Sequence, residues 1–333
     1  MKHIVRTIDE PIYTSPLLDF YFEGLTVGTL DIETTGLSAT RNKYILGGLY
    51  NCETKEFHQF FAENRDEESD ALNAYIEELS KLDVVVTYNG KHFDIPFIEA
   101  RYRRLNGHDI PVKMPFNFDI YLLLNGHSPV KHFVPNLKQK TIENYLGLWD
   151  RRSDEISGAE SVEMYNEYER TADPELERQI LLHNSDDVLQ LVRLMKIIAK
   201  CDFHKGMYKC GFPVGRFTIN KVHVGRDHMA FSGFNRGEPL DYRCYSVGDY
   251  PAHAVFDGRH REFEVKVPII REHGMAIIDL FAAGIDDGPF KAYPTCDSGF
   301  LAVEAASSQN HMEINHFIKA YMNKLSEYMG KEF

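Results

Sequence analysis

The chain has 333 residues and a formal net charge of −13 at pH 7, and 43% of its residues are hydrophobic and 26% charged. This composition is typical of a globular protein, and the length is sufficient for two domains. The negative charge counts against tight nonspecific binding to duplex nucleic acid, because such binding depends on neutralising phosphates with Lys and Arg.

We expect no secretory signal at the start of this sequence. Residues 1–10 are polar and mixed in charge, unlike a secretory signal. No apolar run approaches the length needed to span a membrane. The five cysteines are scattered and odd in number, which favours reduced thiols over a disulfide framework. We therefore expect a cytoplasmic protein with no membrane partner.

The first 200 residues alternate between strand and helix patterns. Apolar, β-rich runs between Gly, Asn and Thr turns predict three antiparallel strands at residues 25–32, 44–50 and 56–61. Apolar residues at helical spacing then predict a helix at 69–82, before a short buried strand at 83–88. The other expected elements are a helix at 95–105, a strand at 116–120 and helices at 137–146 and 173–200. This alternation predicts an α/β fold.

The pattern changes after residue 205. Residues 205–215 hold three glycines and a proline and lack periodicity, which indicates a break. Short β-type segments follow, with an Asp257-Gly258 hairpin signal, and a helix at 311–329 closes the chain. The expected β-type segments are 217–224, 242–247, 253–256, 262–270 and 276–280. We expect one domain at 1–205 and a smaller β-rich domain with a C-terminal helix at 206–333, whose role the sequence does not define.

Two carboxylates, Asp31 and Glu33, stand at the end of the first apolar run. Residues i and i+2 of a strand point to the same face, so these side chains repel each other unless a cation lies between them. Hard divalent ions such as Mg²⁺ prefer carboxylate oxygens. Judged from this pair alone, metal binding and a strand end at which both acids simply face water are equally good interpretations.

A second acid, Asp94, follows the expected strand at 83–88. It comes after an Asn89-Gly90 turn and Phe93, and it precedes a helix with Pro96 in the first turn. A helix-capping role alone explains an Asp at this position but not the turn before it. Asp119, near the end of the expected strand at 116–120, is a further candidate site residue, although a helix cap is the simpler interpretation.

A third polar cluster, His183-Asn184-Ser185-Asp186-Asp187, lies inside the expected helix at 173–200. Asp and Asn are poor helix-interior residues, so their presence needs a reason. His183 and Asp187 are four residues apart and share one face, where a His can act as general base. A solvated polar patch is the alternative.

Taken in order, the three acidic motifs resemble those of the DEDD 3′–5′ exonucleases of the ribonuclease H-like superfamily. Residues 88–98 are similar to the second exonuclease motif of family B DNA polymerases. The chain also resembles the YprB-like ribonuclease H-like family. It shares with that family the stretch at 152–158, then a Tyr-containing helix, then the helix with Leu182-His183-Asn184. The resemblance covers about residues 20–200.

This resemblance implies a ribonuclease H-like mixed sheet flanked by helices. It implies that Asp31, Glu33, Asp94 and Asp187 bind two divalent ions, Mg²⁺ or Mn²⁺. Asp187 fits better than Asp186 because of its spacing from His183. In the family, a Tyr lies four residues before this acid or a His lies five before it. Here a His lies at the tyrosine spacing, which leaves its role as general base open.

The implied activity is a two-metal 3′–5′ exonuclease that acts on single-stranded DNA or RNA. Two alternatives stay open: an endonuclease for hybrids or branched structures, and a nucleic-acid-binding module without catalysis. Basic strips at residues 101–104, 138–140 and 151–152 are candidates to guide a strand, although solvated helix faces show the same pattern. In the second domain, aromatic residues such as Phe217 and Phe231 suit either strand binding or ordinary packing. The sequence leaves protein partners undefined.

Overall fold

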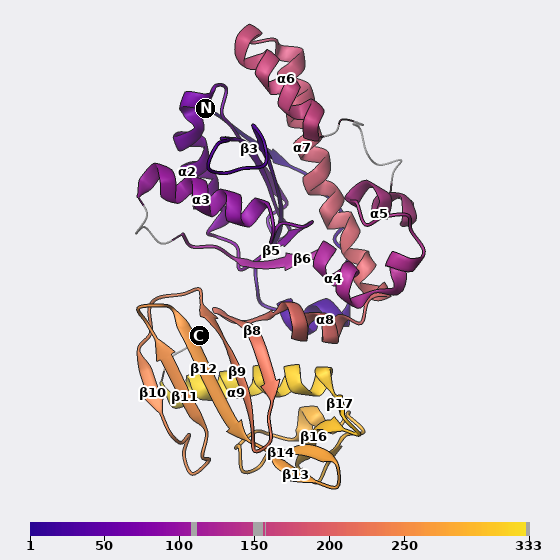
Figure 1. Ribbon diagram of the computed structural model, residues 1–333, viewed down its shortest axis with the longest axis vertical. Coiled ribbons are helices and arrows are strands. Elements are labelled where there is room, and N and C mark those ends of the chain that lie inside the picture. Colours follow the sequence, from indigo (N-terminus) through magenta and orange to yellow (C-terminus); the bar gives the residue numbers. More distant parts are fainter. Residues whose placement is uncertain (108–111, 149–155, 157, 331–333) are drawn as a thin grey trace. The chain divides into compact units, whose positions relative to one another are not determined.

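Figure 1 shows a computed structural model of the chain, which describes residues 1–107, 112–148, 156 and 158–330. The chain divides into two compact units, Met1–Cys201 and Asp202–Phe333. The domain boundary expected at 205/206 stays a prediction. All five cysteines are free of disulfide bonds. Within the described ranges, we find no helix with the length and apolar character needed to cross a membrane.

The first unit is built on a six-stranded sheet with the order β1-β4-β3-β2-β5-β6. The strands β1, β4, β3 and β2 pair antiparallel, whereas β5 and β6 run parallel to β2. The sheet is therefore mixed, as expected. Its strands are β1 (Lys2–Thr7), β2 (Val27–Thr34), β3 (Tyr44–Asn51), β4 (Glu56–Phe61), β5 (Val84–Thr87) and β6 (Phe116–Asp119).

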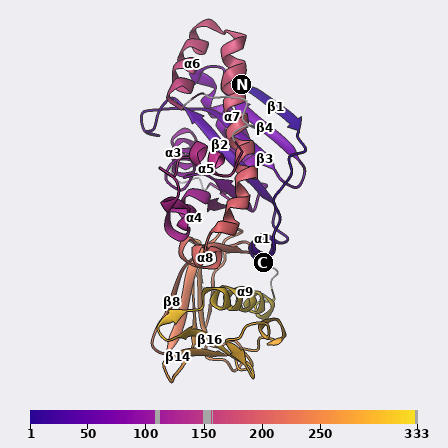
Figure 2. The ribbon, with the colours of Figure 1, turned by 90° about the vertical axis from the view of Figure 1, so that its right-hand side faces the viewer.

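Helices cover both faces of this sheet (Figures 1 and 2). Side chains of α2 and α3 pack on one face in a core that includes Leu30 and Ile32 of β2. Those of α6 and α7 pack on the other face, against β3 and β4. The helices of this unit are α1 (Pro16–Phe22), α2 (Glu68–Leu79), α3 (Asp94–Asn106), α4 (Ile120–His127), α5 (Gln139–Tyr145), α6 (Gly158–Thr171) and α7 (Pro174–Leu194). Short 3₁₀ turns are η1 (Arg65–Glu67), η2 (Pro129–His132) and η4 (Met195–Lys200).

Most expected elements of this unit are present within a few residues of their expected bounds, but β1, α1 and α4 are additional. The edge strand β1 carries Lys2, His3 and Arg6 and is largely exposed, so it lacks the apolar alternation that reveals a strand. The helix α1 has only seven residues, and Ser15 caps it by accepting from the Leu18 amide. The last residues of the helix expected at 173–200 form the 3₁₀ turn η4.

The stretch at 205–215, which the sequence predicted to lack regular structure, instead contains a helix and a strand, so this prediction is wrong. Residues 203–210 form the helix α8 (Phe203–Cys210), which Asp202 caps. Phe203 and Met207 are buried on one face of α8, and Gly211 ends the helix with φ of +101°. Two of the three glycines are therefore a buried helix position (Gly206) and a helix terminus (Gly211), and β7 (Phe212–Val214) follows directly.

Two sheets and the helix α9 (His311–Tyr328) make up the rest of this unit. The first sheet has the order β10-β11-β12-β9-β8-β7, and the expected hairpin joins β11 to β12. The second has the order β13-β14-β16-β15, with β17 paired to β16. Phe217 and Phe231 are buried in the core, so they are not available to a nucleic acid strand.

The strands of the second unit have these bounds: β8 (Phe217–Val224), β9 (His228–Asn235), β10 (Tyr242–Cys244), β11 (His253–Asp257), β12 (Glu262–Pro268), β13 (Ile270–Glu272), β14 (Met275–Asp279), β15 (Cys296–Asp297), β16 (Phe300–Ala305) and β17 (Ser308–Gln309). The 3₁₀ turn η5 (Gly288–Phe290) lies between β14 and β15. The expected class, an α/β region followed by a β-rich region with a C-terminal helix, is confirmed.

Candidate metal centre

The end of β2 directs two carboxylates toward α7. Leu30 and Ile32 belong to the core beneath α2 and α3, so the alternation of the strand turns Asp31 and Glu33 to the opposite face. Glu33 is only 7% exposed, and its Oε2 accepts a hydrogen bond of 3.0 Å from Ser161 Oγ of α6. The two acids therefore share one face, as the sequence predicted.

Asp94 reaches the same region from the loop after β5. Asn89 has φ of +64°, and a Cβ at Gly90 would lie 2.4 Å from Thr87 Oγ1, so this tight turn needs a glycine. Asp94 is the first residue of α3 and is 5% exposed. Its Oδ1 accepts from the Ile32 amide of β2 at 3.3 Å. This bond joins the second motif to the strand that carries the first.

Asp119 holds this turn in place from β6. Its carboxylate accepts hydrogen bonds from the amides of Asn89 (2.9 Å) and Lys91 (3.0 Å). The same side chain caps α4 through the amide of Tyr121 at 3.0 Å. Asp119 is therefore a helix cap, as the simpler interpretation held, and it also tethers the loop that leads to Asp94.

The helix α7 contributes His183 and Asp187. His183 is 3% exposed, and its Nε2 lies 3.5 Å from Glu33 Oε1 and 3.6 Å from Asp187 Oδ2. One ligand atom from each of these three residues lies within 4.8 Å of the others, a spacing that could hold a metal ion. Asp187 lines the pocket at this site and Asp186 does not. The third motif thus meets the first across the sheet–helix boundary.

The buried acids of this site repel one another, and a bound cation would stabilise their charged forms. Burial raises the pKa of Asp31 well above its usual range, and repulsion from Asp187, Asp94 and Glu33 raises it further. Burial also raises the pKa of Asp94 to about 7, against the lowering effect of backbone hydrogen bonds. A divalent cation would relieve this repulsion, and a donor set rich in carboxylate oxygen suits Mg²⁺ or Mn²⁺. The residues present therefore fit such an ion.

A pocket of about 440 Å³ opens over these residues. Asp31, Glu33, His183 and Asp187 line it, while Asp94 lies buried beside it. The rest of its wall includes the hydrophobic Leu37, Phe93, Ile156 and Val162 and the basic Lys138 and Lys140. Acidic, basic and apolar side chains thus converge in one cleft.

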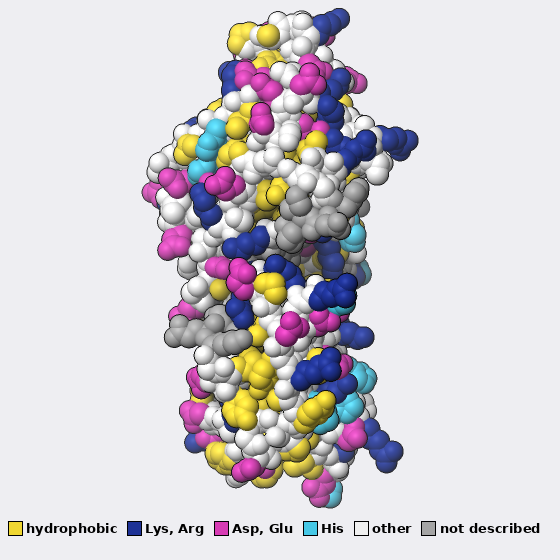
Figure 3. Space-filling model, turned by 90° about the vertical axis from the view of Figure 1, so that its left-hand side faces the viewer, with side chains coloured by type: hydrophobic (Ala, Val, Ile, Leu, Met, Phe, Trp, Pro, Cys, Tyr) yellow, Lys and Arg dark blue, Asp and Glu magenta, His cyan; other side chains and the backbone are white. Residues whose placement is uncertain are grey.

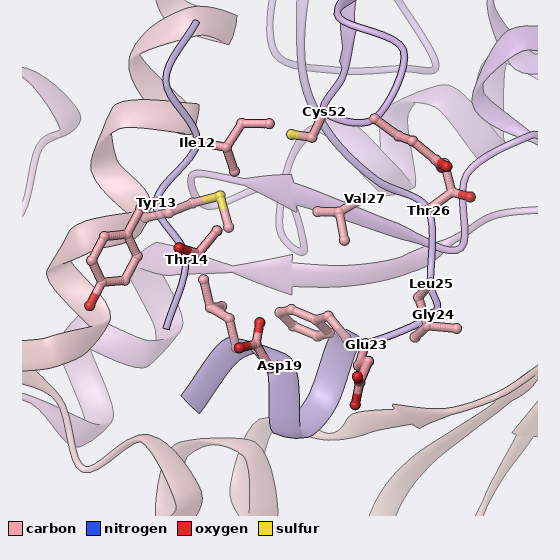
Figure 4. Close-up of a pocket in the computed structure, with 14 residues that line it drawn as sticks. Ile12, Tyr13, Thr14, Asp19, Glu23, Gly24, Leu25, Thr26, Val27 and Cys52 are labelled. Atoms are coloured by element: carbon pink, nitrogen blue, oxygen red, sulfur yellow. The ribbon is translucent and has the colours of Figure 1, made fainter. Parts of the chain in front are cut away.

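Figure 4 shows a different pocket, of about 500 Å³, whose wall includes Val27 at the start of β2 and Cys52. None of the four acids lines this second pocket. The carboxylate site lies instead at the other end of β2, where Glu33 and Thr34 line its pocket.

The candidate basic strips differ in their environments. Residues 138–140 line the carboxylate pocket. Arg101, in contrast, is 5% exposed and makes a buried pair with Glu68, so it is a structural residue. The strip at 151–152 and most of the stretch at 152–158 lie outside the described residues.

Sequence reasoning missed two polar residues that contact the acids, Ser161 and Asn184. Asn184 lies inside the third motif and is fully buried, and its Nδ2 donates to the backbone oxygen and to Oδ2 of Asp31. A buried amide within a helix was a usable signal. Ser161 carries no comparable signal, because a single serine in a polar helix such as α6 is ordinary.

A family model described as the RNase H superfamily matches residues 29–199, just over half of the chain. The chain belongs to the RNase H superfamily. It is also 33% identical over 124 residues to the uncharacterized protein YprB of Bacillus subtilis, a match that covers 36% of this chain and 29% of YprB. The expected membership of a YprB-like ribonuclease H-like family is confirmed. The matched region spans less than a third of the length of YprB.

Solved structures with some likeness include a family B DNA polymerase from Pyrobaculum calidifontis, at 21% identity and a TM-score of 0.41, with 53% of this chain and 24% of that one covered. Exonuclease I of Methylocaldum szegediense covers 93% and 71%, at 11% identity and a TM-score of 0.37. Escherichia coli exonuclease I in complex with a dT13 oligonucleotide covers 92% and 70%, at 11% identity and a TM-score of 0.34. Because these TM-scores lie below 0.5, none of the three determines the activity of this chain. Superfamily membership and the carboxylate cluster together support a nuclease.

Proposed function

We propose that this chain is a metal-dependent nuclease that removes nucleotides from the 3′ end of single-stranded DNA or RNA. The observation that carries the proposal is the convergence of acids from three separate segments. Asp31 and Glu33 come from β2, Asp94 from the start of α3 and Asp187 from α7. Burial raises the pKa of Asp31 and repulsion from the other three acids raises it further, and a bound cation would offset both effects.

In this proposal, Asp31, Glu33, Asp94 and Asp187 would hold two divalent ions. The chemistry supplied by such ions is charge stabilisation of the attacking and leaving oxygens in phosphodiester hydrolysis. Ser161 holds Glu33 through its hydroxyl. His183 places its Nε2 between the carboxylates of Glu33 and Asp187, where it can hold a proton taken from the attacking water.

The pocket also offers groups that suit a nucleic acid strand. Lys138 and Lys140 on its wall provide positive charge for the phosphates near the acids. Leu37, which is 86% exposed at the pocket, and Phe93 offer apolar surface to a base. On the face drawn in Figure 3, Lys and Arg side chains are interspersed with Asp and Glu. In this proposal, Lys138 and Lys140 attract the phosphates only near the pocket, which is compatible with the net charge of −13 of the whole chain.

The direct test is degradation of a 5′-labelled oligonucleotide. We expect stepwise shortening by the purified protein with Mg²⁺ or Mn²⁺, no cleavage in EDTA and a loss of activity of at least about a hundredfold in Asp31→Ala, because a missing ligand removes stabilisation of the transition state. Full activity in Asp31→Ala would contradict the assignment of this acid.

A substrate with a blocked 3′ end distinguishes the proposal from its alternatives. An exonuclease stalls on this substrate, whereas an endonuclease for hybrids or branched structures still cuts it. For the non-catalytic alternative, calorimetry with Mn²⁺ would show no binding to the wild-type protein. The cytoplasmic location stays a prediction, and the proposal covers DNA and RNA alike.

A further inference from the structure

Asn184 holds Asp31 at two atoms. This amide is fully buried in α7. Its Nδ2 donates to the backbone oxygen of Asp31 at 3.1 Å and to Oδ2 of the same residue at 3.3 Å. Because one amide group contacts both the strand and the carboxylate, it fixes the direction in which the carboxylate leaves β2.

Asn184 is itself held by Gln59 of β4, which Arg6 of β1 contacts in turn. Its Oδ1 accepts from Gln59 Nε2 of β4 at 3.1 Å, and this Gln59 nitrogen also donates to the Leu181 oxygen at 2.8 Å. Gln59 Oε1 accepts from Arg6 Nη2 of β1 at 3.1 Å. Arg6 in turn donates to Ser185 Oγ at 3.1 Å. A continuous line of polar contacts thus runs from the edge strand β1 to Asp31.

The guanidinium group of Arg6 determines which group donates and which accepts in each hydrogen bond of this line. A guanidinium group only donates hydrogen bonds, so Gln59 must present its oxygen to Arg6. The Gln59 amide nitrogen then faces Asn184, which must present its oxygen in return. The Asn184 nitrogen is left to face Asp31, whose backbone and carboxylate oxygens both accept. Only one assignment of donors and acceptors satisfies all of these bonds, and in it the Asn184 nitrogen donates to the Asp31 carboxylate.

The neighbouring strand leaves space for this arrangement. A Cβ at Gly48 of β3 would lie 2.3 Å from Asn184 Oδ1 and 2.8 Å from Val188 Cγ2. Both distances are too short for a carbon contact. Gly48 is therefore needed for the packing of the Asn184 amide against the sheet.

We propose that Arg6, Gln59 and Asn184 form a directional hydrogen-bond relay that positions the Asp31 carboxylate to bind a divalent cation. The proposal rests on the proposed function in taking Asp31 as a metal ligand. The three are positioning residues, because none of them lines the metal pocket. Groups that hydrogen-bond to metal ligands typically change metal affinity or activity by about 10–100-fold when they are removed.

The first variant tests the polarity of the relay. Gln59→Glu keeps the size of the side chain and gains an ion pair with Arg6, but it cannot donate to Asn184. The Asn184 amide is then driven to turn its nitrogen toward Glu and its oxygen toward Asp31, where it repels the carboxylate. We expect about tenfold weaker Mn²⁺ binding to the full chain by titration calorimetry. An added negative charge acting only through space would instead strengthen Mn²⁺ binding, so the two explanations predict opposite signs.

Two further variants test the ends of the relay. Asn184→Ala should weaken Mn²⁺ binding by about 10–100-fold, because it removes both bonds to Asp31. Gly48→Ala should weaken it as well, since the added methyl group displaces the Asn184 amide. In the nuclease assay, both variants should lower kcat more than they raise KM, because the substrate pocket is unchanged.

Thr29→Val is the matched control. Thr29 Oγ1 of β2 donates to the Val188 oxygen of α7 at 2.9 Å, so this variant also removes a buried hydrogen bond between β2 and α7. It should lower thermal stability and leave Mn²⁺ affinity within about twofold of wild type, because Thr29 makes no contact with the carboxylate.

The relay is overturned if Gln59→Glu binds Mn²⁺ as tightly as wild type or more tightly, or if Asn184→Ala and Thr29→Val have equal affinities. Wild-type protein that binds Mn²⁺ but cleaves no nucleic acid would contradict the proposed function alone, because the relay is still judged on affinity. Wild-type protein that binds no Mn²⁺ would overturn both.

Discussion

Asp94 shows how burial and repulsion act on a single residue. Its pKa is raised to about 7 from 3.8, mainly because the carboxyl group is buried. The pKa of Asp31 is raised for the same main reason. A carboxyl group with a raised pKa binds protons more tightly in the folded protein than in the unfolded chain. Its protonation therefore stabilises the metal-free fold below about pH 4, and this stabilisation is lost as the pH rises through about 7.

We expect the melting temperature of the metal-free protein to include a component that falls between about pH 4 and pH 7, the unfolded and folded pKa values of Asp94. Saturating Mn²⁺ should oppose this fall, because the ion replaces the protons on the carboxylates. Asp94→Asn should flatten the profile, since its amide does not titrate. Scanning calorimetry in EDTA across this range measures the effect, and identical pH profiles for wild type and variant would contradict it.

The sequence predicted the four acids of the site, but it did not predict the residues that hold them in place. Asp31, Glu33, Asp94 and Asp187 follow from strand alternation, a Gly-bearing turn and helical spacing, all of which are local patterns. Ser161 and Gln59 contact the site only through tertiary packing, from segments about 130 and 30 residues away from the acids of β2. No local pattern encodes those contacts.

At the scale of elements, the turn between β5 and α3 decides where Asp94 lies. Asp119 of β6 accepts from two amides of this turn, at Asn89 and Lys91, while it caps α4. A single buried carboxylate thus sets both a helix start and the approach to the metal site.

Asp119→Ala should lower the free energy of unfolding by about 1–2 kcal/mol through the lost cap. It should also reduce nuclease activity, because the turn that leads to Asp94 loses its tether. Ser15→Ala is a matched control, since Ser15 caps α1, which carries no site residue. Equal activity in the two variants would show that Asp119 is only a cap.

A buried ion pair, Glu68 with Arg101, joins α2 to α3. Arg101 Nε lies 2.7 Å from Glu68 Oε1, and Arg101 Nη2 lies 2.5 Å from Glu68 Oε2, with both residues buried. Glu68 Oε1 also accepts from the Tyr44 amide of β3 at 2.9 Å. The pair therefore connects two helices and the central sheet.

Removal of one partner leaves the other charge buried without compensation. Arg101→Leu should destabilise the fold by about 3–5 kcal/mol in urea denaturation. The double variant Arg101→Leu, Glu68→Gln should be less destabilised than the single one, because the uncompensated carboxylate is gone. A double variant that is less stable than Arg101→Leu would contradict this account.

Expected and observed elements agree best where local pattern and tertiary environment coincide. The strands at β2, β3 and β4 have alternating or continuous apolar runs, and all three are present. The edge strand β1 and the helix α8 were missed, because pairing to β4 and burial of one helix face decide them rather than local sequence.

At the scale of the whole molecule, the proposed chemistry belongs to one of the two units. All four acids, His183 and the relay lie within Met1–Cys201. Asp202–Phe333 contributes none of these residues, and its two sheets and α9 enclose a core of their own. Its role in the protein is open to experiment.

The central claim is that Asp31, Glu33, Asp94 and Asp187 bind divalent ions at the 3′ end of a nucleic acid strand. The most direct test is anomalous diffraction from crystals of the protein with Mn²⁺ and a short single-stranded oligonucleotide. We predict manganese peaks among the four carboxylates, two of them about 4 Å apart and on either side of the terminal phosphate. Manganese bound elsewhere, or a strand that avoids the pocket, would contradict the account.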